Sequence, residues 1–474
     1  IGRMCLDAAG YQTRRGDIKR VNGKGESMTF ENKGKENNGA TYGRRSDWQN
    51  LYTIAKKYYE ALLADPGNAQ FHLTDPRGAS DKSGRTFNNP YQYFFEQMHM
   101  DDAIYADESI YEYPMQQGGG NDGRPYSFGR PSSGGSKAAY PCKSYGQGRI
   151  NPAYFYGIFD PNDMRRDVSI TMTGSNGKGV EKLIPFVPNS KAEGGGLTLN
   201  KWDENRQANP WVAAQRKSGI NGPYMRMSEV YLGYAEVCAA LGDVVTGKQY
   251  LKTVRERSFP QGLADTDGFI ASFGNDLVRA IIEERGFEYA GEGDRRWTLI
   301  RSGYLPEDIK RIKDMTKAMM DGLATKGYYE FENGNIISAY IWTKLVDAKT
   351  IYGHRLTAQC PMDKVNDPVL YPGWRGQKDN WEEMGLNYGN SAPATNLAIK
   401  GLFEIVSEEE AASLESQGYA KVNWGIDLVD YRDEYDKYLF WDYDYVSAPI
   451  YLWPFTPNVM AAGGFTNGYG FKQE

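Results

Sequence analysis

The sequence is poor in the side chains that most often bind metals or carry redox chemistry. Its 474 residues include only four cysteines and three histidines. The cysteines lie far apart and form no CxxC pair, so neither a zinc site nor a thiol redox motif is indicated. The histidines share no helical spacing, which argues against a metal site or a catalytic triad built on histidine.

Long apolar runs and a basic excess are also lacking. No stretch approaches the length of a membrane-spanning helix. With 61 acidic and 55 basic residues, the formal net charge is −6. A surface that neutralises nucleic-acid phosphates needs a surplus of Lys and Arg, so the charge balance argues against a nucleic-acid-binding protein.

Tyrosine and tryptophan, by contrast, are abundant. The chain contains 35 Tyr and 10 Trp, and aromatic residues make up 14% of it although its mean hydropathy is −0.65. These side chains combine an apolar face with a polar group. They can fill the core of a large helical protein or line wet surfaces on which ligands stack, and composition alone leaves both roles open.

The chain begins with “IGRMCLDAAG”, which has neither an initiator Met nor a signal peptide. The segment reads as the last turns of a helix that ends at Gly10. Helices do not usually start at the first residue with an apolar face already formed. We therefore expect a further N-terminal part to precede this sequence and to carry any targeting segment.

Four regions differ in composition along the chain. Residues 1–74 are expected to end an N-terminal helical region, and 75–221 to form a loop-rich segment with short strands. Within 222–303, two helices joined by a very short turn resemble one tetratricopeptide repeat. Residues 304–474 are expected to be irregular and to pack on this scaffold. The predicted fold is mostly α: a tetratricopeptide-like helical hairpin scaffold with a loop-rich, partly β second lobe.

One stretch, “ERGFEYAGEGDRRWTLIRSG” (284–303), concentrates charge on a helix. Glu284 and Glu288 lie one turn apart, so their carboxylates share a face. A glycoside hydrolase needs two carboxyl groups that face each other across a bond. Nearby arginines would also lower the carboxylate pKa, which disables a general acid. The sequence therefore favours a structural network, and we expect Glu284, Glu288, Arg296 and Arg301 to be buried in mutual ion pairs.

Two other motifs contain residues that suit phosphate or calcium. “GGGNDGRPYSFGRPSSGG” is glycine-rich, but it lacks the GK[ST] ending of a phosphate-binding loop and the spacing of a dinucleotide fingerprint. “DPNDMRRD” and “WDYDY” offer oxygen ligands without an EF-hand pattern. No cofactor is therefore predicted, and a structural calcium ion has no support in these spacings.

Two blocks of the sequence resemble the SusD/RagB family, the surface nutrient-binding lipoproteins of Bacteroidetes. They are “RMSEVYLGYAEVCAALGD…YLKTVRERS” and “LVRAIIEERGFEYAGEGDRRWTLIRSG”, with weaker similarity through “DESIYEYP”, “NPAYFYGIFDPNDMRRDVSITMT” and “LWPFTPNV…TNGYGF”. Thr298 stands where the family commonly has Asp, and Gly286 replaces a larger residue. The residues that fit the family pattern are Arg226, Glu229, Tyr231, Ala235, Glu236, Arg255, Arg257, Glu284, Arg285, Glu288, Glu292, Gly293, Arg296, Trp297, Leu299 and Arg301.

The resemblance implies a non-catalytic, lipid-anchored glycan-binding protein on the outside of the outer membrane. Such proteins capture an oligosaccharide and deliver it to a TonB-dependent transporter of the SusC type. The lipidated cysteine is not in this sequence, because “GRMC” around Cys5 is not a lipobox. The alternatives are a glycoside hydrolase acting on polysaccharide, a peptide-binding member of the family, and a repeat-type adaptor that binds only protein.

Candidate ligand-binding rings are those on loops with polar neighbours and with Gly or Pro nearby. Segments “RPYSFGRP”, “KSYGQG” and “WRGQKDNW” meet these conditions. Sugar C–H faces could stack on the rings while hydroxyls bind the polar side chains, although rings of this kind can also pin loops to the body. The predicted ligand-binding residues are Tyr126, Phe128, Arg130, Tyr145, Trp374 and Trp381.

Overall fold

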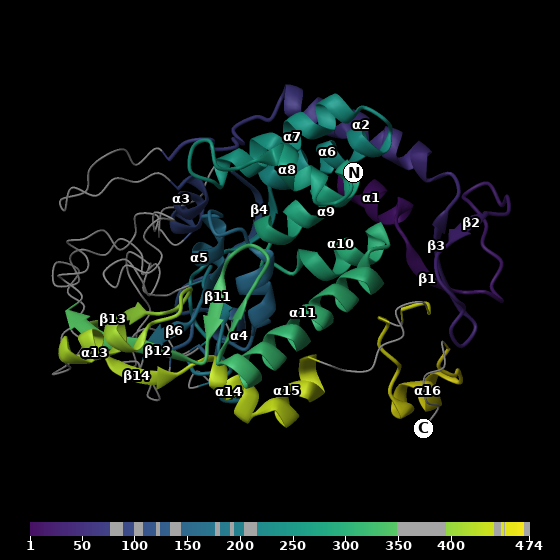
Figure 1. The fold of residues 1–474 in the computed structure, drawn as a ribbon. Helices are drawn as coiled ribbons and strands as arrows, with labels where there is room; N and C mark the ends of the chain where they lie inside the picture. The colour runs from purple at the N-terminus through teal and green to yellow at the C-terminus, as the bar shows by residue number, and fades with distance from the viewer. Residues whose placement is uncertain are drawn as a thin grey trace.

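The fold is mostly α, as the sequence predicts, and Figure 1 shows a group of helices at the top with small sheets below it and to its right. None of its helices, within the ranges described, is both long and apolar enough to cross a membrane. The computed structural model describes residues 1–75, 89–98, 108–119, 124–132, 144–175, 181–189, 194–202, 216–347, 395–439, 447–449 and 451–468.

The helical scaffold is built from antiparallel neighbours, which fits the tetratricopeptide-like prediction. One apolar cluster joins the first, second and sixth helices, and another joins the sixth, seventh and ninth. The first helix ends before Gly10, as expected. These helices are α1 (Gly2–Ala9), α2 (Trp48–Ala64), α6 (Met227–Ala240), α7 (Val244–Arg257), α8 (Thr266–Ala271), α9 (Leu277–Glu288) and α10 (Asp294–Ser302).

Gly247 lies where α6 and α7 come closest. A Cβ atom at this position would lie 3.0 Å from the carbonyl oxygen of Ala235 and 3.1 Å from the Cβ of Ala239. Asp243 caps α7 by accepting a hydrogen bond from the Thr246 amide at 3.3 Å. Glycine at this position therefore allows the tight packing of this hairpin.

Two regions are more ordered than expected. The segment between α1 and α2 forms a three-stranded antiparallel sheet, and the region after residue 304, expected to be irregular, begins with the 22-residue helix α11 (Leu305–Lys326). Pro306 lies in the first turn of α11 and Gly327 ends it at φ 77°. The Lys- and Asp-rich exposed face of α11 resembles a loop in composition, although Met319, Met320 and Leu323 are buried. The sheet consists of β1 (Gln12–Arg15), β2 (Phe30–Asn32) and β3 (Ala40–Arg45).

The second lobe is partly β and contains the largest apolar cluster. At its centre Tyr156, on a π-helical turn, accepts a hydrogen bond at its hydroxyl from the Trp424 indole at 2.8 Å. Its strands pair as β4–β9, β5–β8, β6–β7, β10–β11 and β13–β12–β14. The strands are β4 (Ser109–Tyr113), β5 (Ile170–Thr171), β6 (Thr173–Ser175), β7 (Glu181–Leu183), β8 (Thr198–Leu199), β9 (Gly222–Arg226), β10 (Tyr328–Glu330), β11 (Ile336–Ser338), β12 (Tyr340–Asp347), β13 (Thr395–Lys400) and β14 (Ala420–Asn423).

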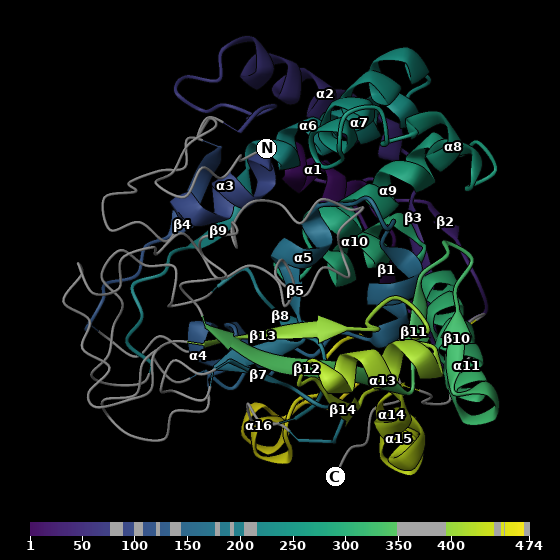
Figure 2. The same cartoon turned by 60° about the vertical axis from the view of Figure 1, so that its left-hand side comes forward.

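The remaining elements are short helices. The ribbon β4–β9 lies beneath α3 and next to the helical scaffold (Figure 2). The π-helical turn spans Tyr154–Ile158. The remaining helices are α3 (Pro90–Gln97), α4 (Arg124–Phe128), α5 (Arg165–Ser169), α13 (Glu408–Ser416), α14 (Gly425–Asp430), α15 (Arg432–Leu439) and α16 (Pro457–Gly463).

Candidate functional site

A buried network of charges lies where the helical scaffold meets the second lobe. Its acidic and basic members balance, five of each, and their side chains are almost fully shielded from solvent. Isolated buried charges would be costly, so such groups occur in pairs. The members are Glu108, Asp163, Arg165, Lys201, Arg226, Arg255, Arg257, Glu284, Glu288 and Glu292.

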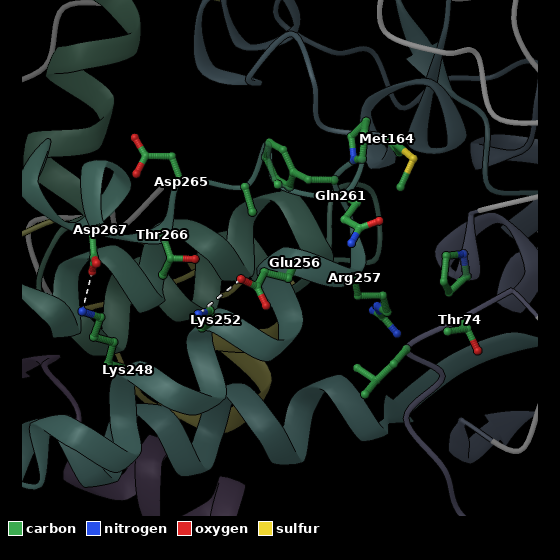
Figure 3. Close-up of a pocket in the computed structure, with 16 residues that line it drawn as sticks. Thr74, Met164, Lys248, Lys252, Glu256, Arg257, Gln261, Asp265, Thr266 and Asp267 are labelled. Carbon is green, nitrogen blue, oxygen red and sulfur yellow. Dashed lines mark ion pairs between the residues drawn. The ribbon is translucent and has the colours of Figure 1, made fainter.

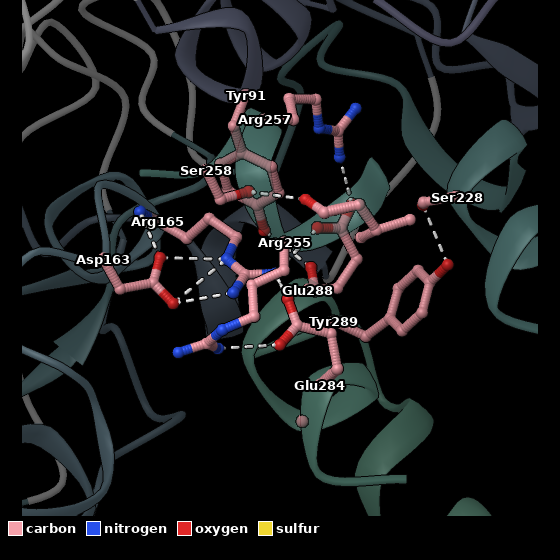
Figure 4. A network of polar contacts seen from close by, with 12 residues as sticks. Tyr91, Asp163, Arg165, Ser228, Arg255, Arg257, Ser258, Glu284, Glu288 and Tyr289 are labelled. Atoms are coloured by element: carbon pink, nitrogen blue, oxygen red, sulfur yellow. Dashed lines mark hydrogen bonds and ion pairs between the residues drawn. The ribbon is translucent and has the colours of Figure 1, made fainter. Parts of the chain in front are cut away.

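Glu288 is the centre of this network (Figure 4). Its Oε1 accepts hydrogen bonds from Arg226 Nη1 at 2.7 Å and from Arg257 Nη2 at 2.6 Å. Its Oε2 accepts one from Arg165 Nη1 at 3.2 Å. Burial alone would raise the pKa of Glu288, but the three guanidinium groups hold this pKa far below the usual range. A carboxyl group that stays ionised and shielded cannot serve as a general acid.

Glu284, one turn earlier on α9, is also buried and paired with arginines. Its carboxylate lies 2.7 Å from Arg165 Nη1 and accepts a hydrogen bond from Arg255 Nη1 at 3.0 Å. Arg165 also donates to Asp163, with 2.7 Å between Nη2 and Oδ2. The sequence prediction that these glutamates are structural is therefore confirmed, although their partners come from other segments than expected.

The other end of the network anchors the ribbon β4–β9. Glu108, immediately before β4, accepts a hydrogen bond from Arg257 Nη1 at 2.6 Å and lies 3.3 Å from Arg226 Nη1. Arg226, the last residue of β9, also donates to Glu292 Oε1 at 2.9 Å. Lys201 Nζ lies 2.6 Å from the same Oε1, and burial lowers the pKa of Lys201 to about 8 against the attraction of Glu292.

The expectation for Arg296 is wrong, and that for Arg301 is confirmed with a different partner. Arg301 is buried and donates to Glu236 Oε2 at 2.8 Å. Arg296 is exposed; its Nη2 donates to the carbonyl oxygen of Tyr451 at 3.1 Å, and its guanidinium lies over Trp297. The reason is helical phase, because Arg301 lies on the inner face of α10 and Arg296 on the outer one.

Both departures from the family pattern have local partners. Thr298 Oγ1 donates to Asp294 Oδ2 at 2.8 Å, and Arg285 Nε donates to the same Oγ1 at 3.3 Å. A Cβ at Gly286 would lie 2.8 Å from Arg295 Nη1. Threonine therefore joins the polar contacts at this end of α10, and glycine leaves room for the Arg295 guanidinium.

Two of the predicted ligand-binding rings lie together. The ring centroids of Tyr126 and Tyr145 are 4.9 Å apart, and the Arg216 guanidinium lies 4.3 Å from the Tyr126 centroid. Tyr126 itself is buried, whereas Phe128, at the end of α4, is 47% exposed. The Tyr126 ring is thus already covered by protein partners, while Phe128 faces solvent. Their roles in ligand binding stay predictions.

Of the other predicted site residues, one is buried and two lie outside the described residues. Arg130 is buried, and its Nη2 donates to Thr173 Oγ1 at 2.9 Å. Its guanidinium therefore contacts the strands of the second lobe. Trp374 and Trp381 lie outside the described residues. Their proposed role as a second platform also stays a prediction.

A polar cleft of about 760 Å³ runs beside α7 and the turn that leads to α8 (Figure 3). Lys248 lies 2.5 Å from Asp267 and Lys252 lies 3.5 Å from Glu256, so its charged rim is paired. Its volume is in the range of small-ligand sites, but such sites are mostly apolar. The cleft could bind a polar ligand by hydrogen bonds, and none of its residues was predicted as a site from the sequence.

The two segments considered for calcium were compared with the acidic side chains that the structure describes. Among the residues it describes, no three His, Cys, Asp or Glu side chains are grouped as metal ligands. In “DPNDMRRD”, the carboxylate of Asp163 is bound by the Arg165 guanidinium. The “WDYDY” segment, 441–445, lies outside the described residues.

Comparison with known proteins gives one family and a set of solved structures. The SusD family matches residues 69–454, and no curated protein matches the chain. A SusD homolog from Bacteroides thetaiotaomicron is 18% identical, with a TM-score of 0.39, covering 56% of this chain and 52% of that one. Surface glycan-binding protein A from Bacteroides uniformis is 19% identical, with a TM-score of 0.37 and coverages of 55% and 47%.

The corresponding protein A from Bacteroides thetaiotaomicron, in complex with laminarihexaose, is 17% identical, with a TM-score of 0.36 and coverages of 55% and 52%. The chain therefore spans about half the length of each of these three solved proteins.

Proposed function

The chain belongs to the SusD family, and on this premise we propose that it is a non-catalytic glycan-binding protein of the cell surface. It captures an oligosaccharide from a polysaccharide outside the cell. The family supports this function, and so do several structural neighbours that are surface glycan-binding proteins.

The observation that favours binding over hydrolysis is the state of the paired glutamates. Glu284 and Glu288 are the pair of carboxylates that a glycoside hydrolase reading of the sequence would have to use. Both are fully buried and bound by arginines, so neither can reach a glycosidic bond. The two carboxylates therefore have a structural role, which favours a binding protein over a hydrolase.

Delivery completes the proposed role. The protein, anchored to the outer membrane by a lipid on the N-terminal part, passes its ligand to a TonB-dependent transporter of the SusC type. Extraction of the full-length protein in mild detergent from cells that express it should recover a complex with a large β-barrel protein. Recovery of the free protein alone, with its lipid attached, would contradict the transporter part of the proposal.

The binding function is tested by affinity electrophoresis in gels that contain laminarin, xyloglucan, amylopectin or pectin. We expect at least one polysaccharide to retard the protein and no new reducing ends to form during incubation. Turnover that Glu288→Gln abolishes, without loss of folding, would instead establish a glycoside hydrolase. Retardation by no polysaccharide, together with binding of a casein digest, would favour the peptide-binding alternative.

A further inference from the structure

Three tyrosines lie exposed and in contact on the ribbon β4–β9. The ring centroids of Tyr111 and Tyr224 are 5.6 Å apart, those of Tyr113 and Tyr224 are 5.7 Å apart, and those of Tyr111 and Tyr113 are 6.3 Å apart. Tyr111 is 56% exposed, Tyr224 is 52% exposed and Tyr113 is 48% exposed. Single exposed rings are common on protein surfaces, whereas contiguous exposed aromatic surface marks a place of contact.

The polar ends of these rings are also available. Within the part of the chain that the structure describes, none of the three hydroxyl groups has a protein hydrogen-bond partner. A buried tyrosine hydroxyl usually finds such a partner, so these groups are hydrated instead. They can exchange water for the hydroxyl groups of a ligand at little cost.

Strand geometry explains why the rings meet. Tyr111 and Tyr113 alternate with Glu112 along β4, and Tyr224 lies on the neighbouring strand β9. Irregular register on both sides of Tyr111 changes the direction of side chains in this ribbon. Glu112 points elsewhere and is half-buried, where it accepts a hydrogen bond from Asn221 Nδ2 at 2.9 Å.

The buried charge network holds this ribbon in place. The strands are joined at one end by Glu108 and Arg226, whose side chains lie 3.3 Å apart, and the Met227 amide donates to the Glu108 carbonyl oxygen at 2.8 Å. Both side chains continue into the ion pairs around Glu288. The three rings are therefore presented by a rigid element, which lowers the entropy cost of binding.

The surroundings of the rings match a hydroxyl-rich ligand. The Arg3 guanidinium lies 5.7 Å from the Tyr224 centroid, and the Arg124 guanidinium lies 5.6 Å from the Tyr113 centroid. Arg3 forms no ion pair with any described residue. Aromatic faces bordered by tyrosine hydroxyls and a guanidinium can hold the C–H face of a pyranose ring and bind its hydroxyls at the edge.

We infer that Tyr111, Tyr113 and Tyr224 form an oligosaccharide-binding platform, which we call the tyrosine platform. The inference rests on the proposed function and assigns it to residues other than those predicted from the sequence. On this platform the rings stack on sugar units, and Arg3 donates hydrogen bonds beside Tyr224.

The test uses the polysaccharide that retards the wild-type chain most strongly in the laminarin, xyloglucan, amylopectin and pectin gels. Tyr224→Ala should weaken binding roughly 2- to 12-fold, the worth of one aromatic contact. The double variant Tyr111→Ala/Tyr224→Ala should weaken it further. Tyr58→Ala is the matched control, because Tyr58 is 45% exposed on α2 and lies outside the tyrosine platform. Its binding should equal that of the wild type.

Chemical protection gives a second readout that does not depend on a variant's folding. Tetranitromethane modifies exposed tyrosines, and peptide mass spectrometry locates them. The bound polysaccharide should protect Tyr111, Tyr113 and Tyr224 and leave Tyr58 reactive. Unchanged binding of the folded double variant, or full nitration of the tyrosine platform in the complex, would overturn the inference while leaving glycan binding intact. Retardation by none of the four polysaccharides would instead refute the proposed function, and this inference with it.

Discussion

Glu288→Gln removes the one carboxylate that Arg165, Arg226 and Arg257 share. The glutamine keeps the size of the side chain, and its carbonyl oxygen can still accept a hydrogen bond. Its NH₂ group, however, would face a guanidinium. The network would also change from five acidic and five basic groups to a buried surplus of one positive charge.

The expected cost follows from burial. Removing one partner of a buried ion pair costs about 3–5 kcal/mol, because the remaining charge stays buried without compensation. The unfolding entropy near the midpoint is about 2.1 cal/mol/K per residue, or about 1 kcal/mol/K for a chain of 474 residues. Each 1 kcal/mol therefore lowers Tm by about 1 °C, and Glu288→Gln should lower Tm by about 3–5 °C.

Glu307→Gln is the matched control, because the same substitution there affects an exposed pair with Lys33. An exposed pair contributes about 0–1 kcal/mol. Differential scanning calorimetry of both variants and of the wild type decides the matter, with urea unfolding as a check. Equal Tm values for Glu288→Gln and Glu307→Gln would refute the view that the network stabilises the fold. Glycan binding by Glu288→Gln well below its Tm should equal that of the wild type.

Three further predictions concern acid stability, helix packing and the predicted tryptophan platform. Burial would raise the pKa of Glu283, but guanidinium groups, that of Arg295 foremost, lower it to about 2. The ionised Glu283 therefore contributes its full stabilisation above the usual carboxyl pKa of about 4.3 and loses it as pH falls toward 2. The urea midpoint of the wild type should drop across this window, and that of Glu283→Gln should drop less. Gly247→Val should destabilise the fold by about 1–3 kcal/mol in urea unfolding, because α6 leaves no room for the side chain; an unchanged midpoint would contradict this packing. Trp374→Ala and Trp381→Ala should reduce retardation in polysaccharide gels, and retardation of both variants as strong as that of the wild type would exclude this second platform.

The helical scaffold could be predicted because its signals are local. The apolar stripe of α6, the capping Asp243 before α7 and the terminating Gly10 each act within a few residues. The sheet between α1 and α2 could not be predicted in this way. Its strands are short and polar, and pairing of β1 with β3 depends on contacts across a long loop.

The charge network shows the same limit at the level of side chains. Helical spacing predicts that Glu284 and Glu288 share a face, and this is correct. Spacing does not reveal that their partners include Arg165, which lies 123 residues before Glu288. Local sequence therefore identifies the acidic residues that share a helix face, whereas the fold is needed to identify the arginines that pair with them.

The sequence indicates only part of the tyrosine platform. The alternation in “SIYEYP” places Tyr111 and Tyr113 on one side of a strand. That Tyr224 comes to lie beside them depends on the pairing of β4 with β9, which are far apart in the chain. The ligand-binding residues predicted from the sequence were rings on glycine-rich loops instead. One of them, Tyr126, is covered by its neighbours.

The arrangement of the network along the chain also sets an order of events during synthesis. Arg165, Arg226 and Arg257 are all translated before Glu288, and 123 residues separate the first of them from it. At about 5–20 residues per second, the ribosome needs roughly 6–25 s to cover that distance. During this interval the arginines lack the carboxylate of Glu288 that all three share, and of their partners in the network only Glu108 and Asp163 have been translated. We expect nascent chains stalled before Glu284 to be cut by protease within α6 and α7, and chains stalled well beyond Glu292 to resist.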